Sequence, residues 1–208
     1  MSRALALAAA CKSGGFNTLL ISGGMPVPHL DTSVVDFLQL PPVRTDGAGF
    51  TQLLDRNSDP ATEALLSERI EILLETLRSR PPDVLITELF PFGRRSLLTE
   101  FETVLGTAKA MERPPIVLSS IRDILEPQAK PIKAIETRER LLRFYDGVLV
   151  HSDPSFVHLD ESWPIADDIA KMLHYTGYIV RPTATRSDAS DDGADEVLVT
   201  AGGGPVGR

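Results

Sequence analysis

The stretch DVLITELFPFGRR, residues 83–95, decides the fold that we predict for this chain. Its first six residues form a short and almost uniformly apolar run, which is typical of a strand buried on both faces in a parallel sheet. Apolar residues at helical spacing precede and follow this strand, which predicts a helix on each side of it. They are Leu65, Leu66, Ile70, Leu73, Leu74 and Leu77 before it, and Leu97, Leu98, Phe101, Val104, Leu105 and Ala108 after it.

The same rhythm of strands and helices extends outward in both directions. Further strands are predicted at residues 18–22, 34–41, 114–120, 147–153 and 174–180. Further helices are predicted from Ser2 to about Lys12 and over about 132–145, and the helix before Pro81 is expected to begin at Asp59-Pro60, with Asp59 as its N-cap. Strands that alternate with helices predict an α/β fold, a Rossmann-like parallel sheet with flanking helices.

The composition changes near the end of the chain. Residues 182–195 lack large apolar side chains, which indicates a linker, and residues 196–208 return to a strand followed by Gly202, Gly203 and Gly204. Glycines directly after a strand are typical of a loop that binds phosphate. We therefore expect one domain over 1–181, a linker over 182–195 and the start of a second, nucleotide-binding domain over 196–208.

Charge and cysteine content exclude several classes of protein. The net charge of −8 argues against nucleic-acid binding, and the single cysteine, Cys11, rules out an internal disulfide framework and suits a cytoplasmic protein. No apolar run reaches the roughly 20 residues of a membrane span. The first residues, MSRALALAAAC, are expected to form a helix, and a lipoprotein signal is the alternative.

Polar residues follow each predicted strand, and ligands of parallel α/β sheets bind beyond the carboxyl ends of the strands. Carboxylates, arginines and a histidine at one edge suit a hydroxyl-rich or phosphorylated ligand. Each also has a structural alternative, such as a helix cap for Glu88, a solvated helix start for Arg94, or a local ion pair between Arg122 and Asp123. No histidine–carboxylate spacing indicates a metal site. The candidates are Gly23, Gly24, Glu88, Phe90, Arg94, Arg122, Asp123, His151 and Asp153.

Six motifs, in order along the chain, resemble those of predicted glycosyltransferases related to the enzyme that adds N-acetylglucosamine to the lipid-linked peptidoglycan precursor. They are LISGG (20–24), DVLITELFPFGRR (83–95), LSSIRDIL (118–125), YDGVLVHSDP (145–154), YTGYIVRP (175–182) and VLVTAGGGPVG (197–207). The resemblance extends from Ser2 to Arg208, and the ELFPFGRR and RDIL stretches are its most specific parts.

This resemblance implies the two-domain GT-B architecture. The N-terminal domain then takes a glycan or lipid-linked acceptor, and the C-terminal domain binds a nucleotide-sugar, usually a UDP-sugar, with Gly202, Gly203 and Gly204 at the start of its loop. The nucleotide-sugar is a co-substrate, and no metal or other cofactor is expected. The acceptor would allow peripheral association with the inner face of the membrane. On this resemblance, Gly23, Glu88, Arg94, Arg122, Asp123 and His151 match positions on the acceptor side.

The resemblance also implies that the chain is truncated at both ends. Family members begin with a strand and a Gly-Leu-Gly-His-like loop ahead of a helix like RALALA, so we expect the first strand and the base histidine upstream of Met1. An incomplete acceptor domain should be inactive alone, marginally stable, and prone to self-association through open sheet edges. The alternative functions are a nucleotide-sugar epimerase of the same architecture and a non-catalytic module that binds a sugar or a lipid head group.

Overall fold

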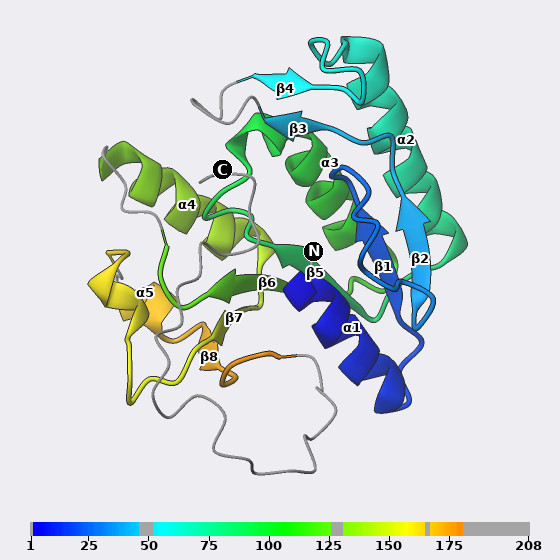
Figure 1. The fold of residues 1–208 in the computed structure, drawn as a ribbon. Coiled ribbons are helices and arrows are strands. Elements are labelled where there is room, and N and C mark those ends of the chain that lie inside the picture. Colours follow the sequence, from blue (N-terminus) through cyan, green and yellow to red (C-terminus); the bar gives the residue numbers. More distant parts are fainter. Residues whose placement is uncertain (1, 46–51, 126–130, 165–166, 181–208) are drawn as a thin grey trace, which may run out of the picture.

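A parallel sheet with flanking helices forms the centre of the molecule. The computed structural model describes residues 2–45, 52–125, 131–164 and 167–180 of the 208. Its main sheet has the strand order β5-β6-β7-β8, and all three pairings are parallel (Figure 1). The strands are Val84–Glu88, Ile116–Arg122, Gly147–His151 and Leu173–Tyr175. The chain thus has the mixed α/β, Rossmann-like fold that the alternation of elements predicted.

Two smaller pairs of strands stand apart from the main sheet. Strand β1 (Leu19–Ser22) pairs in parallel with β2 (Asp36–Gln39), and β3 (Arg44–Thr45) pairs antiparallel with β4 (Leu53–Leu54). Within the part of the chain that the structure describes, neither pair is hydrogen-bonded to β5–β8. The short β3–β4 hairpin was not predicted, because two residues per strand leave no periodic pattern to detect.

The helices lie close to the predicted positions. The described residues contain four helices of 12 to 17 residues, and a short helix of four residues precedes β8. None of the helices in the described residues is long and apolar enough to cross a membrane. Their bounds are Ser2–Ser13 (α1), Glu63–Ser79 (α2), Leu98–Lys109 (α3), Pro131–Phe144 (α4) and Asp167–Ala170 (α5), with 3-10 turns at Arg95–Leu97 and Leu159–Glu161.

The predicted cap of α2 was wrong. The helix begins after Thr62, whose hydroxyl accepts a hydrogen bond from the backbone N–H of Leu65 at 3.2 Å. Asp59 lies in a turn with Asp55, and Pro60 forms a bridge with Leu54 at the end of the β3–β4 hairpin. An Asp-Pro signal marks a turn as well as a helix start, and here the nearby strand makes it a turn.

The two faces of the main sheet are covered differently. On one face, Val117 and Val148 are fully buried in a core that includes side chains of α3 and α4. On the other, Val84, Ile86 and Ile116 keep 45%, 38% and 54% of their surface exposed. The expectation that residues 83–88 are buried on both faces was therefore wrong, because the second face is left partly open.

Helix α1 lies against this second face near the carboxyl end of β5 (Figure 1). Its Leu5 and Ala8 are buried with Leu30 and Val35 in a small cluster beside β1. The linker predicted at 182–195 and the glycines at 202–204 lie outside the described residues, so the structure leaves that division of the chain as a prediction.

Candidate functional site

The loop that follows β5 is anchored in the core. Its residues Leu89 and Arg94 have φ angles of 70° and 61°, a left-handed conformation that is uncommon for residues other than glycine. The Phe90–Pro91 peptide bond in the same loop is cis. The left-handed conformations of Leu89 and Arg94, in one short loop at the carboxyl edge of the sheet, are the kind of backbone strain that clusters at functional sites.

Phe90 provides the anchor. Phe90 is 1% exposed, and its ring stacks on that of Phe101 with 4.4 Å between the ring centroids. Its carbonyl oxygen lies within hydrogen-bonding distance of the hydroxyls of Thr87 at 3.0 Å, Ser119 at 2.8 Å and Tyr145 at 3.1 Å. Phe90 was predicted to bind substrate, but the structure places its ring and its carbonyl in the core, where they fix the loop.

Thr87 and Ser119 lie on strands β5 and β6. Because side chains alternate along a strand, the residue after each of them points to the opposite face of the sheet. Glu88 follows Thr87, and Ser120 follows Ser119. The register pairs Glu88 with Ser120 across β5 and β6, so their side chains lie side by side on the face that α1 approaches. Thr87 and Ser119 thus support the loop from one face of the sheet, and Glu88 and Ser120 form part of the candidate site on the other face.

A chain of polar side chains crosses the sheet on this face. The Ser120 hydroxyl lies 2.8 Å from Glu88 Oε2 and 2.9 Å from His151 Nε2, and His151 Nδ1 lies 2.7 Å from Thr176 Oγ1. The guanidinium of Arg3 forms an ion pair with Glu88 Oε1. Residues from α1, β5, β6, β7 and the segment after β8 therefore meet at the carboxyl edge of the sheet.

The proton positions in this chain follow from counting donors. An ionised Glu88 can only accept, so the single proton of Ser120 points to Glu88. The oxygen of Ser120 must then accept from His151, which places a proton on Nε2. In neutral His151 the bare Nδ1 accepts from Thr176. Every donor in the chain is therefore oriented toward the Glu88 carboxylate.

The charge state of His151 fits this arrangement. Burial lowers the pKa of the His151 imidazole, and the positive charge of Arg3 lowers it further, whereas Glu88 acts in the opposite direction. His151 is therefore neutral at neutral pH. Because the ordinary pKa of histidine, about 6.5, already lies below neutral pH, this lowering further decreases the charged fraction of His151 there.

Exposure separates the residues that a ligand can reach from those that support them. Ser120 and His151 are 1% and 3% exposed, whereas the side chains of Glu88 and Arg3 are 29% and 25% exposed. A ligand at this edge meets Glu88 and Arg3 directly. His151, predicted to contact substrate, lies behind Glu88 and acts on it through Ser120.

The glycines after β1 have different surroundings. A Cβ atom at Gly23 would come within 2.6 Å of Arg69 Nη2, whereas one at Gly24 would meet open space. The carbonyl oxygens of Ser22 and Gly24 both accept from the Gln39 amide at 3.0 Å. Gly23 is thus needed for internal packing, and Gly24 is the glycine that a ligand could approach.

The remaining predicted residues lie at the same edge but outside the polar chain. Arg94 and Arg122 are exposed, and Arg122 pairs with His151 in the strand register. Within the described residues, Arg122 and Asp123 form no ion pair with each other, so that alternative is not realised. Asp153 Oδ1 accepts from the backbone N–H and the hydroxyl of Ser155, and these bonds lower the pKa of Asp153.

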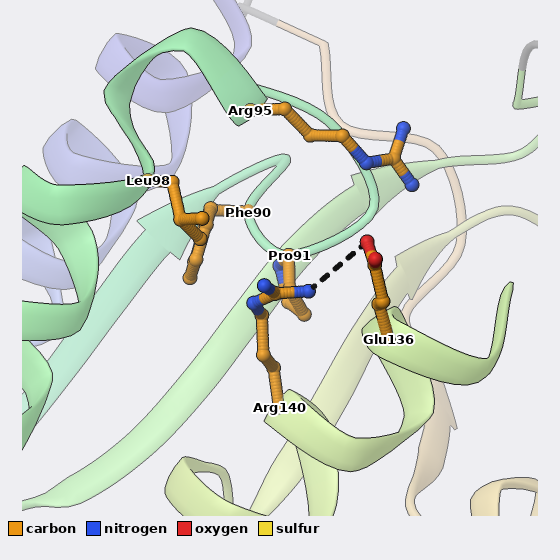
Figure 2. Close-up of a pocket in the computed structure, with 6 residues that line it drawn as sticks. All are labelled: Phe90, Pro91, Arg95, Leu98, Glu136 and Arg140. Carbon is orange, nitrogen blue, oxygen red and sulfur yellow. Dashed lines mark ion pairs between the residues drawn. The ribbon is translucent and has the colours of Figure 1, made fainter. Parts of the chain in front are cut away.

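A small pocket lies between the β5 loop and α4 (Figure 2). Two of its lining residues are arginines, yet Arg140 pairs with Glu136 at 3.7 Å and with Glu102 at 2.8 Å. These carboxylates balance the arginine charges, so the pocket is not a strong anion site. It is lined by Phe90, Pro91, Arg95, Leu98, Glu136 and Arg140.

The described residues contain no group of three histidine, cysteine, aspartate or glutamate side chains that could hold a metal ion. The predicted nucleotide-binding residues Gly202, Gly203 and Gly204 lie outside the described part of the chain. Sequence reasoning did not assign roles to Arg3 and Thr176, because nothing in the pattern shows that α1 and the segment after β8 meet β5. Ser120 was detectable as a polar residue at the end of an otherwise apolar strand.

Comparison with known proteins adds no relative. No family model matches this chain, and searches of curated proteins and of solved structures find no match either. The motifs in the sequence and the geometry of the Glu88 site are therefore what indicate a function.

Proposed function

We propose that this chain is the acceptor-binding part of a glycosyltransferase that uses a nucleotide-sugar as donor. One observation carries the proposal: a partly exposed carboxylate, Glu88, is held by Ser120 and Arg3 at the carboxyl edge of a parallel sheet. Carboxylates fixed in this way bind sugar hydroxyls well, because a charged acceptor strengthens each hydrogen bond. The order of the six sequence motifs supports the same class of enzyme.

In the proposed reaction, Glu88 accepts a hydrogen bond from a hydroxyl of the acceptor and fixes its orientation. The acceptor oxygen attacks the anomeric carbon of the donor sugar, and the bond from that carbon to the nucleotide diphosphate breaks. The hydroxyl proton passes to a general base, and the diphosphate leaves with the bonding electrons. Orientation of the attacking hydroxyl is a large part of such catalysis.

A non-catalytic sugar-binding module is the second candidate. The burial of Ser120 and His151 favours it, since neither side chain can touch a reacting atom without a change in the surface. Both candidates require that Glu88 bind a sugar hydroxyl, so binding is tested first and transfer second.

Binding is measured by saturation-transfer NMR with a panel of soluble hexoses, N-acetylhexosamines and their disaccharides. We expect a sugar to bind weakly and Glu88→Gln to reduce the affinity about tenfold or more, because a hydrogen bond to a charged group is lost. Glu75→Gln is the matched control, since Glu75 is an exposed carboxylate on α2. A wild-type chain that binds none of the sugars, or a Glu88→Gln variant that binds as well as wild type, would disprove the proposal.

Because the acceptor part alone is expected to be inactive, transfer is measured next on the full-length product of the gene, with the sugar that binds and a panel of labelled UDP-sugars. A new glycoside indicates a glycosyltransferase. A free epimerised nucleotide-sugar indicates the epimerase. Binding without either product indicates a sugar-binding module.

A further inference from the structure

The molecule contains a second polar cluster, and it is more deeply buried than the Glu88 site. Arg69 on α2 is 1% exposed and Glu100 on α3 is 8% exposed. Arg69 Nε donates to Glu100 Oε2 at 2.8 Å and Nη2 donates to Oε1 at 2.9 Å, which is a bidentate pair. Neither residue belongs to the set that the sequence predicted for the site.

The same guanidinium also binds the backbone after β1. Its Nη1 donates to the carbonyl oxygens of Gly23 at 2.9 Å and Pro41 at 2.5 Å. Gly23 O accepts from Val43 N as well, at 3.1 Å. Arg69 therefore joins the ends of β1 and β2 to the helices.

Glycine at position 23 belongs to this arrangement. A Cβ atom there would come within 2.6 Å of Arg69 Nη2, closer than real contacts allow. The guanidinium thus occupies the space that a side chain at 23 would need. Residues 23, 69 and 100 depend on one another, although 31 positions separate Arg69 from Glu100.

The position of Glu100 gives the cluster its connection to the candidate site. Glu100 lies in the first turn of α3, and α3 begins at Leu98, after the 3-10 turn Arg95–Leu97 that ends the loop following Glu88. The pair therefore fixes the glycine loop after β1 against the helix that starts at the end of the β5 loop. Both loops lie at the carboxyl ends of parallel strands.

We propose that Arg69 is a positioning residue, which holds the Gly23-Gly24 loop in place for a ligand bound at the Glu88 edge. This inference rests on the proposed function, since it assumes that the ligand is the sugar acceptor. A buried ion pair contributes little net stability compared with apolar side chains of similar volume. The pair can therefore be replaced without unfolding the chain, and what is lost is the bonds to Gly23 and Pro41.

The test is the double variant Arg69→Met with Glu100→Leu. Apolar replacements on both sides leave no unpaired buried charge, so we expect the variant to fold with a melting temperature near that of wild type. Hydrogen exchange is followed in peptides covering residues 19–26. We expect exchange there to be about tenfold faster or more, and affinity for the bound sugar to be about tenfold weaker, because the carbonyl oxygens of Gly23 and Pro41 have lost their hydrogen bonds to the charged guanidinium.

The matched control is Arg140→Met with Glu102→Leu. It removes a more exposed arginine–glutamate pair between α4 and α3, with Arg140 Nε at 2.8 Å from Glu102 Oε1. Its hydrogen bonds go to side chains and not to the glycine loop, so exchange over 19–26 should stay at the wild-type rate.

The outcomes separate this inference from the proposed function. Unchanged exchange over 19–26, or faster exchange with unchanged affinity, overturns the positioning role. If wild type binds no sugar, the proposed function fails, and the exchange result alone decides whether Arg69 holds the loop. If the double variant does not fold, Arg69→Lys replaces it. Lysine keeps the charge beside Glu100 but cannot bind both carboxylate oxygens of Glu100 and the carbonyl oxygens of Gly23 and Pro41 together. The same exchange and affinity criteria apply.

Discussion

At the residue scale, His151 is the group whose chemistry the fold changes most. It is buried, and its Nε2–H supports Glu88 through Ser120. A histidine held in one tautomer by a hydroxyl on each nitrogen is suited to orient a neighbour. It is less suited to exchange protons with a ligand, since both nitrogens already have partners.

The depressed pKa of His151 predicts a pH-dependent stability. The unfolded chain binds a proton at this residue more readily than the folded chain does. Stability from His151 is therefore complete above about pH 6.5 and is lost as the pH falls toward the lower, folded pKa. Urea unfolding between about pH 5.5 and 7.5 should show wild type becoming less stable toward the acid end.

His151→Gln is the comparison for this measurement, because its amide can still donate to Ser120 and does not titrate. The groups with lowered carboxyl pKa values, such as Asp36 and Asp153, titrate further toward acid and are the same in both proteins. The free energy of unfolding should vary less with pH in His151→Gln than in wild type. Equal slopes in the two proteins would show that His151 does not titrate as its burial implies.

Residues of the site were predictable to different degrees. Glu88 and His151 stand at the ends of apolar runs, so the rule for carboxyl edges placed them together. Arg69 was hidden, because it lies within a stripe of leucines on α2 and looks like any solvated arginine of an amphipathic helix. Its burial depends on Glu100, and no local pattern connects the two residues.

At the scale of the element, α2 is stabilised by its N-cap and by the packing of one of its faces against α3. At its N-terminus the Thr62 hydroxyl accepts a hydrogen bond from the backbone N–H of Leu65. Leu77 packs with Val104 and Ala108 of α3. The leucine spacing predicted this helix and its end correctly, whereas its start was set by the preceding hairpin, which periodicity does not record.

Thr62→Ala should destabilise the chain by about 1 kcal/mol, because the N-terminal N–H of Leu65 loses its partner. Thr62→Ser, which keeps the hydroxyl, should cost much less. Ser67→Ala is the matched control, since Ser67 is exposed within the same helix and alanine is a better helix former. Urea unfolding measures all three variants, and equal stability of Thr62→Ala and wild type would show that the cap contributes nothing.

At the scale of the whole molecule, the described residues form two parallel sheets that do not pair. Strand β1 pairs with β2, and β5 pairs with β6, so each has one edge without a neighbouring strand in the described part of the chain. The alternation of strands and helices predicted parallel pairing, and the structure agrees. The alternation did not predict that β1 and β2 form a separate sheet, because it does not show which strands lie next to each other in space.

The open edge of β5 predicts self-association. Its outer backbone groups can pair with another strand, and Val84 and Ile86 on the same strand are exposed apolar side chains. Ile86→Lys places a charge on this edge strand and should weaken association about tenfold or more, as charges do on natural edge strands. Ile135→Lys is the control, because Ile135 is equally apolar and 51% exposed but lies on α4. Sedimentation velocity over a range of concentrations should show wild type and Ile135→Lys associating alike and Ile86→Lys shifted toward monomer. A wild-type chain that stays monomeric throughout would show that the open edges are protected in another way.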